Sequence, residues 1–119
     1  MDEVINNLKN LNLLYAEDNP NIQETTRTTL ELLFNTVYTA KDGLEALEIY
    51  KNNTIHIALL DYIMPNMDGL TLVHEIYALN DTKIPIIIAT GFAYEIDDKE
   101  FFQELNGKIW FIEKPLKYD

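Results

Sequence analysis

Residues 57–69 read Ile-Ala-Leu-Leu-Asp-Tyr-Ile-Met-Pro-Asn-Met-Asp-Gly, and this stretch decides the fold. The aliphatic run at 57–60 predicts a strand that is buried on both faces of a parallel sheet. Asp61 follows directly, and the turn-forming residues Pro65 and Asp68-Gly69 come next. Open α/β sheets bind ligands at the carboxyl ends of their strands, so Asp61 lies where a functional site is expected. A lone aspartate at this place would more often only cap the loop, so a functional role for Asp61 depends on whether other polar residues lie near it.

Further predicted strands also end in side chains that can ionise or donate a hydrogen bond. They are residues 11–16 before Glu17 and Asp18, residues 84–89 before Thr90, and residues 109–112 before Glu113 and Lys114. Because the carboxyl ends of parallel strands lie along one edge of a sheet, we expect these side chains to converge on Asp61. Carboxylates that share one crevice repel each other, and Mg²⁺, which prefers a small number of hard oxygen ligands, relieves that repulsion. Lys114 and Thr90 would then bind the oxygens of a phosphoryl group on Asp61.

The rest of the chain alternates strands with helical patterns, which is typical of a parallel sheet covered by crossover helices. The remaining strand is expected at residues 37–40. Helices are expected at residues 2–10, 20–34, 43–50 and 95–105, with another directly after Gly69. Pro20 favours a helix start, and Asn106-Gly107 favours a helix end.

Length and composition indicate one globular domain. The 119 residues predict a single domain over 1–119, with a core from about 11 to 115 and a leading segment at 1–10. The net charge of −11 argues against direct binding to nucleic acid or to an anionic membrane surface. Cysteine is absent, and neither a membrane-spanning apolar run nor a cationic leader is found, so a cytoplasmic location is expected.

Taken together, these motifs resemble the receiver domain of two-component response regulators, over about Leu11 to Pro115. The matching pieces are Glu17-Asp18, Asp61-x-x-Met64-Pro65-x-Met67-Asp68-Gly69, Thr90 and Lys114-Pro115, with the run from Lys41 to Leu47 fitting the start of the family's second helix. The resemblance implies a flavodoxin-like, doubly wound sheet of five parallel strands in the order 2-1-3-4-5. It also implies a signalling module that catalyses only its own phosphorylation and slow dephosphorylation, and so is not an enzyme acting on external substrates.

The resemblance assigns a role to each site residue. Asp61 would accept a phosphoryl group from the phosphohistidine of a histidine kinase or phosphotransfer protein. The metal ligands of Mg²⁺ would be the side chains of Asp18 and Asp61 and the backbone carbonyl of Ile63, with Glu17 assisting through metal-bound water. The remaining roles are the binding of phosphoryl oxygens by Thr90 and Lys114, and a switch formed by Thr90 and Phe111 that alters contacts with a downstream effector protein.

The sequence departs from the family pattern in two respects. The family has a fifth helix after the position of Lys114-Pro115, and this helix is expected to be missing or truncated here. One sheet face would then be open, and we expect either a second protomer, forming a homodimer, or the leading segment to cover it. The second departure is that Phe111 has no hydroxyl group to hydrogen-bond in either state of the switch.

Other function classes fit the sequence less well. An interaction module that works without phosphorylation would be expected to have lost at least one site residue, and none is lost. A phosphohydrolase with an aspartyl nucleophile would need a second acid at position 63, where the chain has isoleucine. A flavin-binding protein would need a phosphate-binding loop after the first strand, but Glu17-Asp18 would repel the phosphate.

Overall fold

Parallel strands form one sheet in the computed structural model of the chain, which describes residues 2–79, 83–91 and 108–114. The strands are β1 (Asn12–Ala16), β2 (Thr36–Ala40), β3 (Ile57–Asp61), β4 (Ile86–Thr90) and β5 (Ile109–Glu113). Their spatial order is β2-β1-β3-β4-β5 with every neighbouring pair parallel. The helices are α1 (Asp2–Leu8), α2 (Pro20–Leu30), α3 (Gly43–Asn52) and α4 (Gly69–Leu79). The predicted fold class and strand order are therefore confirmed.

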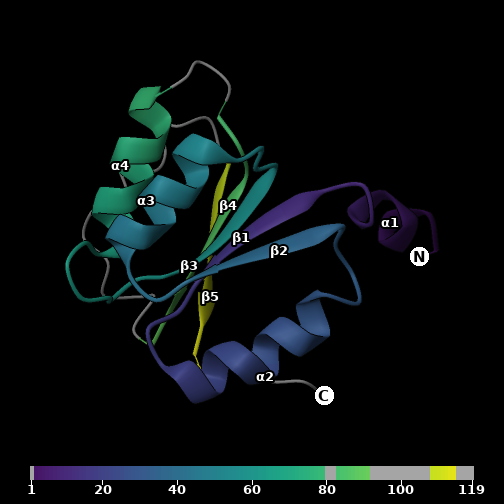
Figure 1. The fold of residues 1–119 in the computed structure, drawn as a ribbon, viewed down its shortest axis with the longest axis horizontal. Coiled ribbons are helices and arrows are strands. Elements are labelled where there is room, and N and C mark those ends of the chain that lie inside the picture. Colours follow the sequence, from purple (N-terminus) through teal and green to yellow (C-terminus); the bar gives the residue numbers. More distant parts are fainter. Residues whose placement is uncertain (1, 80–82, 92–107, 115–119) are drawn as a thin grey trace.

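The helices divide between the two faces of the sheet, with α3 and α4 on one face and α2 on the other (Figure 1). Side chains alternate along each strand, so that Leu14 and Leu60 join the core under α3 and α4, while Leu13, Tyr15 and Leu59 join a smaller core under α2. Burial on both faces explains why these strands have nearly continuous apolar sequences.

Helix α2 ends at Leu30, so the prediction that it continues to residue 34 is wrong. The last turn tightens, because the N–H groups of Leu32 and Leu33 bond carbonyls three residues back, at 3.1 and 2.9 Å. The N–H of Asn35 then donates to the Leu11 carbonyl at 2.9 Å, which directs the chain into β2. Four threonines between positions 25 and 29 weaken the helix, since β-branched side chains lose rotamer freedom there.

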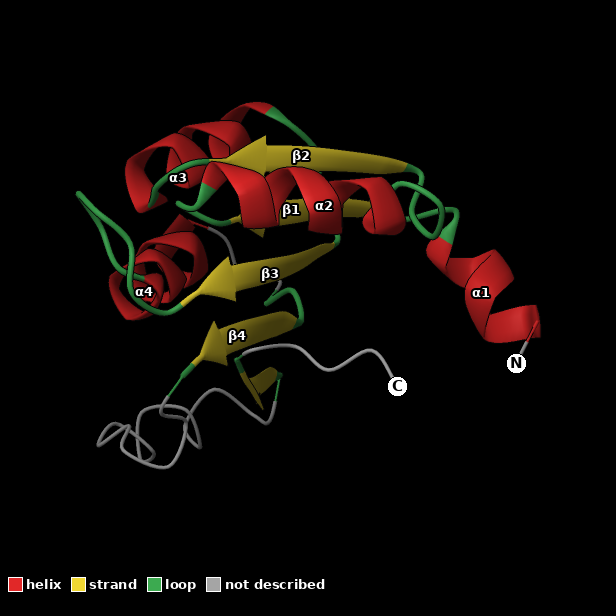
Figure 2. Ribbon diagram, turned by 90° about the horizontal axis from the view of Figure 1, so that it is seen from below, coloured by secondary structure: helices red, strands yellow, loops and turns green. Residues whose placement is uncertain are grey.

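The leading segment forms the expected helix, α1, but does not cover the sheet. Figures 1 and 2 show α1 beyond the amino-terminal ends of β1 and β2, well away from β4 and β5. Of the two coverings expected for the open face, only the second protomer remains as a prediction. The predicted helix at 95–105 and the truncated fifth helix after Lys114 lie outside the described residues. Among the residues that are described, no helix is long and apolar enough to cross a membrane.

Candidate functional site

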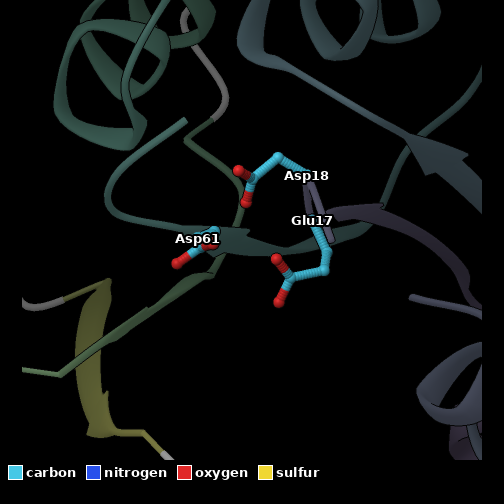
Figure 3. A group of neighbouring side chains, drawn as sticks. All are labelled: Glu17, Asp18 and Asp61. Atoms are coloured by element: carbon cyan, nitrogen blue, oxygen red, sulfur yellow. The ribbon is translucent and has the colours of Figure 1, made fainter. Parts of the chain in front are cut away.

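The sheet topology gathers acidic side chains at the carboxyl ends of β1 and β3. Asp61 is the last residue of β3, and Glu17 and Asp18 directly follow β1, which pairs with β3. One carboxylate oxygen from each of the three residues lies within 4.8 Å of the others. Figure 3 shows these carboxylates around a common space, with Glu17 and Asp18 reaching toward Asp61 from the neighbouring strand end. Glu17 and Asp61 are buried, whereas Asp18 is exposed.

Lys114, which directly follows β5, brings a positive charge to the acidic group. Its Nζ lies 3.0 Å from Glu17 Oε1 and 3.0 Å from Asp61 Oδ2. The backbone N–H of Lys114 donates to the Thr90 carbonyl at 2.8 Å, which continues the pairing of β5 with β4 past the end of the strand. One ammonium group thus bridges two buried carboxylates that come from different strands.

Burial dominates the electrostatics of this group. Burial raises the pKa of Asp61 to about 7; the hydrogen bond from Lys114 opposes this shift, and the neighbouring Glu17 adds to it. Burial also disfavours the charge on Lys114, but its hydrogen bonds to Asp61 and Glu17 outweigh burial and raise the pKa of the ammonium. A single lysine therefore compensates only part of the negative charge.

This charge imbalance predicts that Asp61→Asn stabilises the metal-free protein at neutral and higher pH. The pKa of Asp61 lies above its ordinary value of 3.8, so the folded state binds the proton more tightly, and the free energy of unfolding falls as pH rises from about 4 to about 7. Asparagine keeps the shape without the charge, and we expect a gain of about 1–3 kcal/mol at pH 8. Urea unfolding of the wild type and of Asp61→Asn in EDTA, at pH 5 and at pH 8, measures the difference in the free energy of unfolding.

The exposed Asp18→Asn serves as the matched control for this experiment. Its effect on the free energy of unfolding should stay within about 0.5 kcal/mol. A loss of stability in Asp61→Asn at pH 8 would show that the ionised carboxylate is favourable where it lies, contrary to the argument from burial.

The donor set fits a magnesium ion. Glu17, Asp18 and Asp61 all offer carboxylate oxygens, the hard donors that Mg²⁺ prefers, and the exposed Asp18 leaves room for the waters that Mg²⁺ retains. Oxygens spread over 4.8 Å can close on such an ion by small side-chain rotations. A divalent cation would also neutralise the charge that Lys114 leaves uncompensated. The geometry thus supports a cation site at Glu17, Asp18 and Asp61.

The other residues predicted for the site lie around this cluster. Thr90 is buried at the end of β4, next to Ala89, the β4 residue that pairs with Asp61. Phe111 lies on β5, packs against the core under α3 and α4, and pairs with Ile88, two residues before Thr90. Strand alternation places Thr90 and Phe111 on the same face of the sheet. Ile63 lies in the loop after β3, and its side chain is 69% exposed.

A cavity of about 590 Å³ opens beside the acidic group, between α2 and the sheet. Its walls include Tyr15 and Leu59 from the sheet and Ile22 and Thr26 from α2, and Asp61 and Lys114 also line it. The sequence indicated an open face here but did not single out Tyr15, because a tyrosine in a buried strand has no signal that separates it from ordinary core.

The sequence also gave no prediction for a hydrogen bond between the loop after β3 and the start of α3. Asn66 Nδ2 donates to Asp42 Oδ2 at 2.8 Å. The available signals were Asp42-Gly43, a usual helix start, and Asn66, a residue type that tolerates a left-handed backbone. Neither signal indicates a partner 24 residues away.

Comparison with known proteins gives consistent matches. The family model of the response regulator receiver domain matches residues 13–119. A probable transcriptional regulator, ycf27, of Cyanidium caldarium is 37% identical over 110 residues, which cover 92% of this chain and 43% of that protein. A probable C4-dicarboxylate response regulator, DctR, of Priestia megaterium is 31% identical over 115 residues, covering 95% of this chain and 49% of the relative. The chain thus spans less than half the length of these relatives.

Among solved structures, a CheY-like response regulator receiver domain protein from Methanospirillum hungatei superposes with a TM-score of 0.78. The two sequences are 25% identical, and the superposition covers 91% of this chain and 84% of the other.

Proposed function

Because the chain belongs to the family of response regulator receiver domains, we propose that Asp61 is the residue that accepts a phosphoryl group in a two-component signalling pathway. One observation carries the assignment to Asp61. Asp61 ends β3, the strand between β1 and β4, so it lies between the acidic pair that follows β1 and Thr90 at the end of β4, and its buried carboxylate is 3.0 Å from the Lys114 ammonium. Glu17 is equally close to this ammonium but follows β1, one strand further from Thr90. An acceptor needs this combination, because the group it receives brings further negative charge into the site.

The proposed reaction moves a phosphoryl group from a phosphohistidine to Asp61. A carboxylate oxygen of Asp61 forms the new bond to phosphorus, and the bond between phosphorus and the imidazole nitrogen breaks. The electron pair of that bond stays on the imidazole, which then takes a proton. Lys114 and Thr90 would bind the oxygens of the transferred group, as an ammonium and a hydroxyl group can. Beyond this transfer and its slow hydrolysis, the domain would turn over no metabolite.

Mg²⁺ would be held by Asp18, Asp61 and the backbone carbonyl of Ile63, with Glu17 assisting through water. When bound, the ion would supply positive charge that keeps Asp61 ionised and lowers the repulsion between its carboxylate and the incoming phosphoryl oxygens. The raised pKa of Asp61 supports this role for the ion, since without added positive charge part of the carboxyl population is protonated at neutral pH.

The proposed output is a change in protein contacts. Thr90 and Phe111 share one sheet face on adjacent strands, so movement of Thr90 toward a phosphoryl group would open space into which Phe111 can turn. The partners would be a histidine kinase or phosphotransfer protein and a downstream effector. The lack of cysteine and the expected kinase fit a cytoplasmic location.

Incubation with acetyl phosphate and Mg²⁺, read by intact mass, tests the proposal. We expect the wild type to gain one phosphoryl group and Asp61→Asn to gain none. Asp68→Asn is the matched control: Asp68 accepts a hydrogen bond from the Thr71 N–H, a role that asparagine can also fill, so this variant should be phosphorylated normally. Beryllofluoride with Mg²⁺ should in addition change the fluorescence of Trp110, which is half exposed on β5.

The same experiment distinguishes the proposed function from the alternative one. A folded wild type that gains no mass and shows no response to beryllofluoride would indicate an interaction module that works without phosphorylation. Phosphorylation that persists in Asp61→Asn would place the acceptor on another residue.

A further inference from the structure

The loop of residues 62–68 links Asp61 to α4 and contains Ile63. Both ends of the loop are fixed to the sheet edge. The N–H of Tyr62 donates to the Ala89 carbonyl at 2.9 Å, and the N–H of Gly69 donates to the Tyr62 carbonyl at 2.7 Å. Met64 is buried in the core under α3 and α4. The tip of the loop lies against the start of α3, where the Met67 backbone approaches Gly43 closely, and a side-chain anchor there would hold the tip in place.

Asn66 provides that anchor at the tip. Its backbone has a φ of 69°, which is in the left-handed region that asparagine tolerates better than most residues. Its side-chain amide donates to Asp42 Oδ2 at 2.8 Å. The bond joins the exposed Asn66 to a buried carboxylate at the start of α3.

Asp42 is well suited to receive this bond. Its other oxygen, Oδ1, accepts a hydrogen bond from the backbone N–H of Glu45 at 2.8 Å, which caps α3 and fixes the carboxylate in place. The Glu45 N–H in the first place, and Asn66 in addition, hold the pKa of Asp42 below its ordinary value, so the acceptor stays ionised. Hydrogen bonds to an ionised acceptor are stronger than neutral ones.

We propose that the hydrogen bond between Asp42 and Asn66 positions the Ile63 carbonyl for Mg²⁺, which makes both residues positioning residues for the phosphorylation site. Ile63 lies between the fixed Tyr62 and the buried Met64, and Asn66 holds the backbone that follows Met64, so releasing Asn66 would let the Ile63 carbonyl tilt to other orientations. A backbone ligand that must be ordered on binding weakens metal affinity. The inference rests on the proposed function, because the carbonyl of Ile63 has this task only in a phosphoryl acceptor that uses Mg²⁺.

One single substitution removes the bond, and another weakens it. Asn66→Gly removes the amide and keeps a residue that adopts the left-handed backbone without strain. Asp42→Asn keeps the cap of α3, since asparagine also accepts from the Glu45 N–H, but it replaces the ionised acceptor with an NH₂ group, so that only a weaker, neutral bond to a turned Asn66 amide can form. We expect each variant to raise the Mg²⁺ dissociation constant of the unphosphorylated protein roughly three- to tenfold in calorimetric titration.

A double substitution should restore the affinity. In Asp42→Asn with Asn66→Asp, the donor and the acceptor exchange places, and the same hydrogen bond forms in the opposite direction. We expect its Mg²⁺ dissociation constant to return to within about twofold of wild type. Phosphorylation by acetyl phosphate should show the same pattern as a shift in the Mg²⁺ requirement, with near-normal rates once Mg²⁺ is saturating. A purely structural role would not produce this pattern.

Several outcomes would overturn the inference. The inference would be wrong if the single variants bound Mg²⁺ as tightly as the wild type. It would also be wrong if the double variant bound Mg²⁺ no better than the weaker single variant. Hydrogen exchange at the Met67 and Gly69 amides, measured without metal, tests the anchor separately and should accelerate in both single variants. If the wild type binds no Mg²⁺ and is not phosphorylated, the proposed function fails. If the wild type binds Mg²⁺ and is phosphorylated, and the variants behave in the same way, only the positioning role fails.

Discussion

Replacing Lys114 with methionine is expected to lower the free energy of unfolding by about 2–4 kcal/mol at pH 8. Methionine keeps most of the apolar stem but removes the ammonium that lies 3.0 Å from both Glu17 Oε1 and Asp61 Oδ2. Two buried carboxylates would then face each other without a cation. The loss should shrink near pH 5.5, because Asp61, with a pKa of about 7, then takes up a proton and relieves the repulsion. Denaturant unfolding in EDTA at both pH values measures it.

Two further variants sharpen this experiment. Lys51→Met is the matched control. Lys51 is exposed and pairs with the exposed Glu48 at 3.8 Å, so its replacement should change the free energy of unfolding by less than about 0.5 kcal/mol. Adding Glu17→Gln to Lys114→Met should recover much of the lost stability. Phosphorylation of Lys114→Met by acetyl phosphate should be slower by about 10²-fold, as expected when one preorganised cation is lost from a phosphoryl-transfer site. If Lys114→Met were as stable as wild type at pH 8, the charge balance inferred for the site would be wrong.

Gly43→Ala is expected to destabilise the fold by roughly 3 kcal/mol or more. A Cβ at this position would lie 2.2 Å from the Met67 carbonyl oxygen and 2.9 Å from the Met67 carbonyl carbon, both backbone atoms. Helix α3 and the loop after β3 would have to separate, which would also stretch the bond between Asp42 and Asn66. The gain of about 1 kcal/mol that alanine gives in a helix is too small to offset this clash. Thermal unfolding measures the effect.

Gly91→Ala is the matched control, since a Cβ there meets none of the described residues within 4 Å. It should unfold within a few degrees of wild type. Equal melting temperatures for the two alanine variants would mean that the loop can move away from α3 at little cost, and this would also count against a positioning role for Asn66.

The sheet and its acidic edge could be predicted from the sequence because each depends on local patterns and one topological rule. Strands buried on both faces have apolar runs, such as Ile57–Leu60, that are short and plainly bounded. Parallel pairing then brings every strand end to one edge, so the proximity of Glu17, Asp18, Asp61 and Lys114 follows from the strand assignment.

Features that depend on packing between distant segments could not be predicted in this way. The end of α2 at Leu30 depends on the bond from Asn35 to Leu11, which becomes apparent only when β2 is placed beside β1. The position of α1 beyond the strands is a tertiary property that helical periodicity does not contain. The contact of Gly43 with Met67 likewise depends on how closely the loop approaches α3, and no local signal encodes that distance.

The long sequence separation within the site has a consequence for synthesis of the protein. Glu17 and Lys114, whose side chains bond at 3.0 Å, are 97 positions apart. During translation the first carboxylates leave the ribosome long before the lysine that balances them, and the edge strand β5 is the last of the described strands to emerge. If Asp61 is the acceptor, as proposed, a nascent chain carries it in an incomplete pocket, and a kinase would find no competent substrate until nearly the whole domain has emerged and folded. Competence for phosphorylation would then report completion of the fold.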